Sequence, residues 1–408
     1  MALNTESKSL QGVEVGTIER ELRDLWKQMA EATQAVGENP VLRACVLNLV
    51  VYAPGEQSAA TVSEIIAEVT AEHPSRAIVL IPEPDAPSSS VSARVTAQCR
   101  LTIGGRKQVC CEQIVIPAEG QGIQQLPSIV RSLLVPDLPV FLWWRDHTGG
   151  FQIRHQEYRV FNELVETSDR VIVDSAMLPD PEDGLVKLAA LIHERSPWAA
   201  FSDLNWSRLT PWRVSISGFF DVPDWRPYLA RINRVEIDYE QAPTAHRSIS
   251  SQVLLIVGWL AGRLKWRPTS KLQWTGHEYR LELAAKNRAI FVQIRTSPPK
   301  PQGTDPLPLP SLHTLRLLAE EEPAAEFIVS GSKGDPSGRS YLQTSVKLAG
   351  THLTGDITGL NLGSEAKLIN TELEILTPDT VYAQALAMAA KITTNVRCPL
   401  SLAHCPLY

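Results

Sequence analysis

Residues 45–81, CVLNLVVYAPGEQSAATVSEIIAEVTAEHPSRAIVLI, decide the fold of the first half of the chain. The apolar run over residues 45–52 predicts a buried strand, and the run over residues 77–81 predicts a second one. Between them, apolar residues recur with helical spacing over residues 62–69. This spacing of strand, helix and strand predicts a βαβ unit with two parallel strands and a right-handed crossover.

The sequence on either side of this unit extends it to a mixed sheet. Residues 93–116 predict two antiparallel strands around Gly104 and Gly105, because glycine supplies the positive φ of a tight hairpin turn. A helical stripe over residues 18–29, for which Thr17 is the expected cap, precedes the unit. Helix and strand patterns alternate again over residues 123–174. We therefore expect an N-terminal mixed-sheet α/β domain that contains the βαβ unit.

The second half of the chain has a different pattern, which predicts an α+β domain. We expect a first helix over residues 249–264, a hairpin over residues 279–295 and a final helix over residues 379–392. A polar meander of short strands is expected over residues 326–376, and the proline-rich residues 298–310 predict a stiff surface loop.

Length and composition are typical of a globular protein with more than one domain. A chain of 408 residues exceeds the size at which one core stops growing, so we expect an N-terminal domain over residues 1–200 and a C-terminal domain over residues 201–408. The net charge of -6 offers no basic surface, which makes nucleic acid an unexpected partner. The longest apolar run, residues 253–261, is far shorter than the roughly 20 residues of a membrane span. The first residues, MALNTESKSLQG, lack the apolar core of a signal peptide, so a cytoplasmic protein without membrane contact is expected.

Tryptophan is clustered: six of the ten tryptophans lie between Trp143 and Trp225, in segments such as LPVFLWWRD and DLNWSRLTPWR. Tryptophan and arginine dominate the energetics of protein–protein contacts, so this region favours a binding surface over a reaction centre. For the segment DLNWSRLTPWR, a seam between the two domains, with rings packed inward and guanidinium groups stacked on them, is the favoured interpretation, and it can overlap with a partner-facing surface. The candidate residues for a partner interface or a domain seam are Trp143, Trp144, Asn205, Trp206, Arg208, Trp212 and Arg213.

The sequence contains none of the common catalytic motifs. Both glycine-rich segments, around Gly104 and over residues 331–338, lie between predicted strands and are expected to be hairpin turns. No nucleophile elbow, HExxH segment or paired CxxC is found, and the nine histidines are scattered. Asp146 and His147 follow a predicted strand, where α/β folds tend to place sites, but a polar turn that closes the strand is the favoured interpretation. We expect no catalytic residue, no cofactor and no metal site.

The six cysteines fall into three pairs, two of them in predicted strands and one near the end of the sequence. Cys45 and Cys99 lie in apolar strand patterns and are expected to be core thiols. Cys110 and Cys111 are adjacent in a strand and should point to opposite faces, one buried and one exposed.

Near the end of the chain, Arg397 and His404 each stand beside a cysteine, Cys398 and Cys405, and cationic neighbours favour the reactive thiolate. A disulfide between these two cysteines would close a loop of about eight residues and stabilise it by about 2.5 kcal/mol. The alternative is a frayed tail with two idle thiols.

Four strings of residues resemble the OpcA family of glucose-6-phosphate dehydrogenase assembly proteins. They follow one another in the order of that family: EHPSR at residues 72–76, LVPDLPV at 134–140 before Trp143, DLNWSRLTPWR at 203–213 and GWLAGRL at 258–264. The resemblance covers both halves of the chain.

This resemblance implies a non-enzymatic assembly factor and allosteric activator of glucose-6-phosphate dehydrogenase in the oxidative pentose phosphate pathway. The tail resembles that of cyanobacterial members, which implies control by thioredoxin through a redox disulfide of Cys398 and Cys405. Two other classes remain open. One is a sugar-phosphate-handling enzyme with a Trp/Arg-lined pocket, which would depend on Asp146, His147 or Arg208, and the other is an inert scaffold.

Overall fold

The computed structural model describes residues 5–6, 10–11, 15–36, 42–43, 45–101, 108–145, 155–240, 249–286, 288–297, 311–332, 341–348, 350–359 and 364–394. The chain divides into two compact units, and each unit is assembled from three separate stretches. Unit 1 comprises Met1–Asp174, Glu194–Leu204 and Gly363–Asp379. Unit 2 comprises Ser175–His193, Asn205–Leu362 and Thr380–Tyr408. These units are groups of residues in contact, whereas the sequence predicted two continuous domains that meet near residue 200. That domain division stays a prediction.

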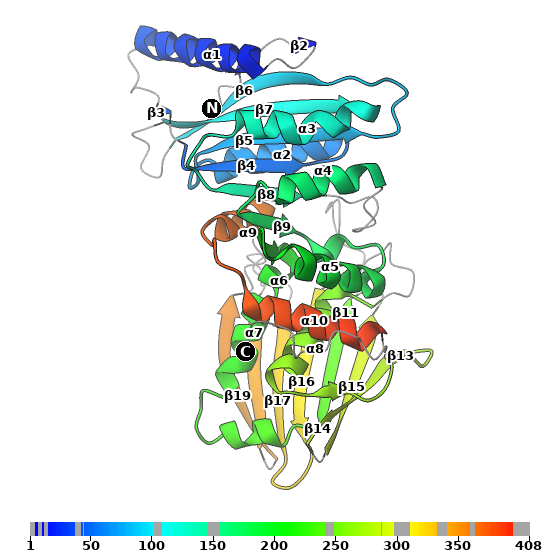
Figure 1. Ribbon diagram of the computed structural model, residues 1–408. Helices are drawn as coiled ribbons and strands as arrows, with labels where there is room; N and C mark the ends of the chain where they lie inside the picture. The colour runs from blue at the N-terminus through cyan, green and yellow to red at the C-terminus, as the bar shows by residue number, and fades with distance from the viewer. Residues whose placement is uncertain are drawn as a thin grey trace. The chain divides into compact units, whose positions relative to one another are not determined.

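A mixed sheet forms the centre of unit 1 (Figure 1). Its strand order is β1-β6-β7-β5-β4-β8-β9-β10, with β2 beside β6 and β3 beside β7. The strands are β1 (Thr5–Glu6), β2 (Leu10–Gln11), β3 (Leu42–Arg43), β4 (Leu47–Tyr52), β5 (Ser75–Glu83), β6 (Ser92–Leu101), β7 (Gln108–Glu119), β8 (Val140–Trp144), β9 (Arg170–Val173) and β10 (Ala200–Asp203). The expected mixed sheet is confirmed, because β6 and β7 are antiparallel while β4 is parallel to both β5 and β8.

The parallel part of this sheet is doubly wound. From β4 the chain moves outward to β5 and β7 on one side, then returns to β8, β9 and β10 on the other side. The predicted βαβ unit is confirmed as β4, α2 (Glu56–Val69) and β5, with Leu47 opposite Ser75 in the parallel register. The direction of winding changes between β4 and β8, and ligands of such folds usually bind at this position, outside the carboxyl ends of the strands.

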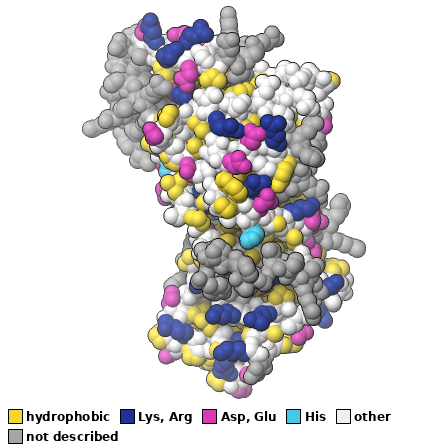
Figure 2. All heavy atoms as spheres, viewed as in Figure 1, with side chains coloured by type: hydrophobic (Ala, Val, Ile, Leu, Met, Phe, Trp, Pro, Cys, Tyr) yellow, Lys and Arg dark blue, Asp and Glu magenta, His cyan; other side chains and the backbone are white. Residues whose placement is uncertain are grey.

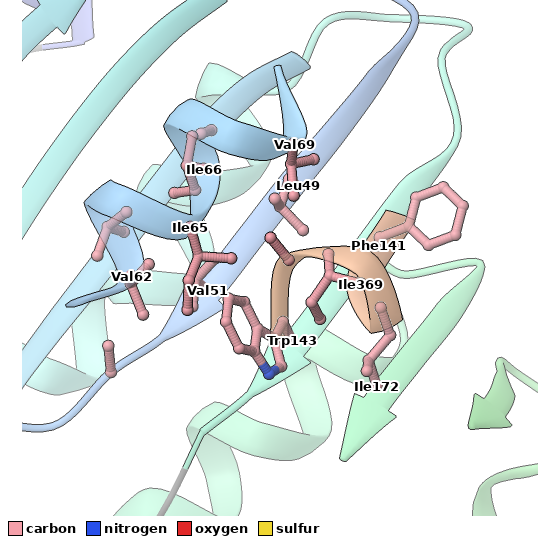
Figure 3. Close-up of a cluster of buried hydrophobic side chains, with 14 of the residues drawn as sticks. Leu49, Val51, Val62, Ile65, Ile66, Val69, Phe141, Trp143, Ile172 and Ile369 are labelled. Atoms are coloured by element: carbon pink, nitrogen blue, oxygen red, sulfur yellow. The ribbon is translucent and has the colours of Figure 1, made fainter. Parts of the chain in front are cut away.

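Within the described residues of unit 1, five helices flank the sheet: α1 (Val15–Val36), α2, α3 (Leu126–Leu133), α4 (His155–Val165) and α9 (Glu365–Leu373). A short 3-10 helix, η1 (Gly120–Gln125), precedes α3. Figure 3 shows α2 and α9 over the same core, with Ile66 and Ile369 directed toward the strands that carry Val51 and Trp143. The predicted strand meander over residues 326–376 is therefore wrong at its end, where α9 forms. Ala366, Ile369 and Leu373 share one helix face, and that face is buried.

Helix α1 is fixed to the sheet by a buried ionic cluster. Arg76 on β5 forms an ion pair with Glu112 on β7 at 2.8 Å and another with Glu19 of α1 at 2.9 Å. Trp26 of α1 donates its indole N–H to Glu112 at 2.7 Å. The helix expected from residue 18 is confirmed, but it begins at Val15, so Thr17 lies inside its first turn and is not the cap.

A second mixed sheet forms the centre of unit 2, in the order β12-β14-β15-β11-β16-β17-β18-β19 with β13 beside β14. The predicted hairpin is confirmed, because β14 and β15 are antiparallel neighbours. The strands are β11 (Arg234–Glu240), β12 (Arg267–Pro268), β13 (Gln273–Trp274), β14 (Glu278–Ala285), β15 (Arg288–Ser297), β16 (Ser311–Ala319), β17 (Ala325–Ser332), β18 (Tyr341–Leu348) and β19 (Thr351–Gly359).

The helices of unit 2 include both that the sequence predicted, α8 (Ser251–Arg263) and α10 (Thr380–Thr394). Ser250 caps α8 by accepting a hydrogen bond from the amide of Gln252. These two helices pack so closely that a Cβ atom at Gly258 would overlap the carbonyl oxygen of Ala385. The other helical segments are α5 (Pro181–Arg195), which ends in unit 1, α6 (Leu204–Arg208), α7 (Thr210–Phe219), η2 (Ser175–Met177) and η3 (Arg226–Ala230).

Candidate functional site

The first candidate site is the crevice of unit 1 between the carboxyl ends of β4 and β8. In a doubly wound sheet this position receives the phosphates of a nucleotide, which approach the amino end of the helix that follows the first strand. Here that helix is α2, and Arg145 stands directly after β8. The residues at these two places decide whether the crevice can hold such a ligand.

The turn between β4 and α2 is unsuited to a phosphate. It contains a single glycine, Gly55, whose φ of 81° needs glycine's conformational freedom. Pro54 has no amide hydrogen to offer, and Glu56 places a carboxylate in the first turn of α2. That carboxylate forms an ion pair with Arg94 at 3.0 Å. A negative side chain at this helix end repels an anion, so the turn lacks the features of a dinucleotide site.

Arg145 fills the crevice from the other side. Its backbone amide donates to the carbonyl oxygen of Tyr52 at 2.9 Å, and its guanidinium group donates to Ser58 Oγ in α2 at 3.2 Å. The same guanidinium makes two hydrogen bonds to the carboxylate of Glu365, at 3.1 and 3.3 Å. Since Glu365 is the first residue of α9, the positive charge at the crevice is neutralised by the protein itself.

Helix α9 is held in place along its whole length. Three of its side chains, Ala366, Ile369 and Leu373, belong to the core beneath α2. Near its carboxyl end, Glu372 pairs at 3.0 Å with Arg170 of β9, and both side chains are almost completely buried. Arg170 also donates to the carbonyl oxygen of Thr377 at 2.9 Å. An ion pair therefore holds each end of α9, and the pair at its amino end lies beside the crevice.

The second candidate site, the tryptophan segment of unit 2, is mostly interior. Trp206 and Trp212 are buried, and Arg213 stacks on Trp206 with its Cζ atom 3.6 Å from the ring centroid. The ring of Tyr382 in α10 also lies near Trp206, at 5.8 Å between centroids. Leu209 separates α6 from α7, and Pro211 lies in the first turn of α7. The sequence predicted guanidinium groups stacked on the rings of this segment, and the structure shows that Arg213 and Trp206 form such a pair.

Asn205 has a structural role in the same unit. Its side-chain amide donates to Ser175 Oγ and to Ser251 Oγ, each at 3.0 Å, and it is fully buried. Arg208 is half-buried and interacts with other groups. Contact of this segment with a partner protein stays a prediction, and burial gives its tryptophans and Asn205 a packing role that is independent of any partner.

The sequence groups Trp143 and Trp144 with the tryptophan segment. In the structure these two residues belong to unit 1, whereas Trp206 and Trp212 belong to unit 2. They alternate across β8, so their rings enter opposite faces of the sheet. Trp143 joins the core beneath α2 and α9, whereas Trp144 stacks on Tyr52 at 3.7 Å and meets the edge of Phe161 at 4.8 Å. Both are buried, and their predicted contact with a partner is untested.

The thiols that the structure describes are poorly reactive. Cys111 is buried and hydrogen-bonded to Thr70 Oγ1 at 2.8 Å, and burial raises its pKa to about 11. Cys45 is half-buried, and burial also raises the pKa of this thiol. Cys398, Cys405, Asp146 and His147 lie outside the described residues, as do the side chains of Cys99 and Cys110. One member of the adjacent pair, Cys111, is buried as the sequence predicted, and the exposure expected of the other stays a prediction.

Within the described ranges, no group of three or more His, Cys, Asp or Glu side chains is arranged to hold a metal ion. None of the described helices combines the length and apolar character needed to cross a bilayer. In the view of Figure 2, acidic and basic side chains occur on the surface of both units.

Comparison with protein families gives two matches that together cover most of the chain. Residues 66–190 match the family model described as the glucose-6-phosphate dehydrogenase subunit N-terminal domain. Residues 199–386 match the corresponding C-terminal domain model. Both models carry the OpcA family name.

Curated relatives agree with these matches. The chain is 32% identical over 209 residues to the OxPP cycle protein OpcA of Synechocystis sp., covering 51% of this chain and 41% of that protein. It is 33% identical over 213 residues to the OpcA of Nostoc punctiforme, covering 51% and 42%. The match to the Synechococcus elongatus OpcA is 29% over 306 residues, covering 73% and 61%. These alignments span less than two thirds of each relative.

Solved structures show only a distant likeness. A glucose-6-phosphate 1-dehydrogenase from Mycobacterium avium is 11% identical with a TM-score of 0.48, over 88% of this chain and 93% of that one. The regulator Gal80p from Kluyveromyces lactis is 9% identical with a TM-score of 0.42, over 86% and 88%. Similarity at this level leaves function open. The two domain models and their order along the sequence show that this chain belongs to the OpcA family of glucose-6-phosphate dehydrogenase assembly proteins.

Proposed function

We infer that this chain binds glucose-6-phosphate dehydrogenase in the cytoplasm and stabilises its assembled, active form without catalysing a reaction itself. The family description names that dehydrogenase, and the curated relatives are named for the OxPP cycle. The oxidative pentose phosphate pathway is therefore the expected setting.

The non-enzymatic part of this proposal rests on the residues that stand at the crevice of unit 1. A dehydrogenase of this fold needs an open switch point and a glycine-rich turn to hold its dinucleotide. Here Pro54 and Glu56 occupy the turn, and Arg145 is neutralised by Glu365 from α9. Opening the crevice would break that ion pair and expose the core beneath α9, so binding a dinucleotide there would be costly.

Activation requires that the chain bind one state of the dehydrogenase better than another. A ligand shifts an equilibrium only by the ratio of its affinities for the two states. We propose that the preferred state is the assembled one with the higher affinity for glucose 6-phosphate. A partner with equal affinity for all states, an inert scaffold, would leave the kinetics unchanged.

Redox control by thioredoxin is proposed to act through Cys398 and Cys405. Thiolates are the reactive species in disulfide exchange, and burial raises the pKa values of both Cys45 and Cys111. These two thiols are poor candidates for the switch, which supports the tail pair. In thiol–disulfide exchange, the dithiol of reduced thioredoxin would open a Cys398–Cys405 disulfide and itself become a disulfide, and exchange with oxidised thioredoxin would run in reverse, so that two electrons and two protons pass between the two proteins.

The test combines the size of the dehydrogenase with its kinetics. Its sedimentation and its glucose 6-phosphate saturation curve are measured with and without this chain, in oxidising and in reducing buffer. We expect a larger assembly and a lower KM with the oxidised chain, and a loss of this redox dependence when Cys398 and Cys405 are both replaced by Ser. Unchanged size and kinetics would refute the activator role, and equal activation by oxidised and reduced chain would refute the switch.

A sugar-phosphate-handling enzyme with a Trp/Arg-lined pocket is the alternative. It predicts turnover by the purified chain alone and loss of that turnover on replacing Arg208, Asp146 or His147. The inward packing of Trp206 and Trp212 disfavours a pocket lined by these rings. Purified chain incubated with glucose 6-phosphate and NADP, with no dehydrogenase added, distinguishes the two.

A further inference from the structure

The sheet of unit 2 has one apolar face and one charged face. Residues such as Val235, Ile237 and Val292 are buried on the first face, and α7 and α8 contact this sheet. Alternate residues of the same strands point to the other side. We call this the charged sheet face, and its members on β14, β15, β11, β16, β17 and β18 are Glu278, Arg280, Glu282, Phe291, Gln293, Arg295, Arg234, Glu236, Asp238, Arg316, Leu318, Glu326, Ile328 and Lys347.

The charges on this face balance and are paired across the strands. Five acidic side chains (Glu236, Asp238, Glu278, Glu282, Glu326) stand among five basic ones (Arg234, Arg280, Arg295, Arg316, Lys347). Arg316 lies 3.2 Å from Glu236, Arg295 3.5 Å from Asp238, and Lys347 2.8 Å from Glu326. Charges that are already paired lose less free energy when water is removed than isolated charges do. The face therefore suits burial against a surface that is also neutral overall.

Three apolar side chains lie among the charged residues of this face, two of them level with the amino end of β11. Phe291 on β15 and Leu318 on β16 are both opposite Arg234 of the intervening strand β11. Ile328 lies one strand further, on β17, opposite Arg316. Phe291 is 49% exposed, which is unusual for a phenylalanine in the middle of a large sheet. Apolar residues surrounded by charged ones reproduce the centre and rim of a protein interface.

The face is large enough for a stable dimer. Seven neighbouring strands from β14 to β19, spaced about 4.8 Å apart, give a width of roughly 29 Å. With about 20 Å along the strands, the area is roughly 600 Å², close to the roughly 800 Å² that each partner contributes to a standard interface.

We propose that the charged sheet face binds the same face of a second copy of this chain across a twofold axis. A second copy presents the same balanced charges, so the two faces meet without net repulsion, and most homo-oligomers use such a self-complementary patch. A strongly acidic or basic partner would gain little from a face with no net charge. The proposal is independent of the dehydrogenase.

Sedimentation equilibrium of the full chain over a range of concentrations tests this proposal. We expect the average mass to rise from that of one chain toward that of two. Phe291→Asp should raise the dissociation constant by about tenfold or more, because a carboxylate would be buried at the apolar centre of the face. Val214→Asp is the matched control: Val214 is 58% exposed on α7 in the same unit, and this variant should dimerise as the wild type does. Circular dichroism melting of both variants confirms that they are folded.

Three results would overturn the proposal. One is a wild-type chain that stays monomeric up to about 100 µM, since interfaces of this size usually associate more tightly. Another is a dimer that Phe291→Asp leaves intact, which would place the interface elsewhere. The third is a monomeric wild-type chain whose complex with glucose-6-phosphate dehydrogenase is lost in Phe291→Asp but kept in Val214→Asp, which would assign this face to the dehydrogenase.

Discussion

Arg145 and Glu365 are 220 residues apart in the sequence and form a two-bond ion pair at the carboxyl end of β8. Through this pair, the amino end of α9 is attached beside the crevice in which folds of this type hold a nucleotide. The Arg145 side chain is 9% exposed and that of Glu365 is 27% exposed, so the pair is largely shielded from water. The pair attaches α9 to the end of β8 and neutralises the charge of Arg145.

Replacing Glu365 by Gln should destabilise unit 1 by about 1–3 kcal/mol, because it leaves the charge of Arg145 buried without a counter-ion. Urea denaturation measures the loss, and hydrogen exchange of the α9 amides locates it. Glu374→Gln is the control, since Glu374 is exposed at the end of the same helix. Equal losses in the two variants would show that the ion pair has no special role.

Arg170 and Glu372 should behave as a coupled pair. Each single replacement, Arg170→Met or Glu372→Leu, leaves a buried charge unpaired and should cost about 3–5 kcal/mol. The double replacement should cost much less than the sum, because both charges are then removed together. A double-mutant cycle on the free energy of unfolding measures this coupling. Additive losses would mean that the two side chains do not depend on each other.

Cys111 should make the stability of the protein fall in alkaline solution. Burial raises the pKa of this thiol from 9.0 to about 11, so between these pH values the unfolded chain loses the proton while the folded chain keeps it. The stabilising effect is complete below pH 9 and is lost as the pH rises toward 11, by up to about 3 kcal/mol.

Cys111→Ala is the matching variant for this alkaline effect. In this variant the hydroxyl of Thr70 still donates a hydrogen bond to the carbonyl oxygen of Ile66 at 2.7 Å, so it is not left without a partner. Burial also raises the pKa of Tyr239, and the difference between wild type and variant removes that common contribution. A constant difference in unfolding free energy from pH 8 to pH 11 would contradict the assignment to Cys111.

Trp206→Ala should lower the free energy of unfolding by about 3–5 kcal/mol, because the ring is buried against Tyr382 and Arg213. If the segment also contacts the dehydrogenase, the affinity of the folded fraction should fall by at least about 1–2 kcal/mol. Thermal melting and binding are measured on the same samples. Trp198→Ala, which removes a ring that is 51% exposed, is the control for the loss of stability.

Local patterns predicted the elements whose partners lie nearby in the sequence. The βαβ unit was predicted because residues 45–81 contain two apolar runs and, between them, apolar residues at helical spacing. The hairpin of β14 and β15 was predicted from a local pattern in the same way. Helix α9 was missed because its nine residues hold only three core positions within a polar region that otherwise predicts strands. Its partner surface is formed by residues more than 200 positions earlier, which no local pattern records.

The sequence by itself therefore determined the βαβ unit of the first sheet, the β14–β15 hairpin of the second sheet, helices such as α2, α8 and α10, and the family of the protein. Only the tertiary structure decided that Glu365 neutralises Arg145, that Arg213 is the side chain that stacks on Trp206, and that opposite charges stand side by side on the sheet of unit 2. The physical reason is that periodicity records which side of an element is buried, whereas strand register and helix docking select which side chains meet.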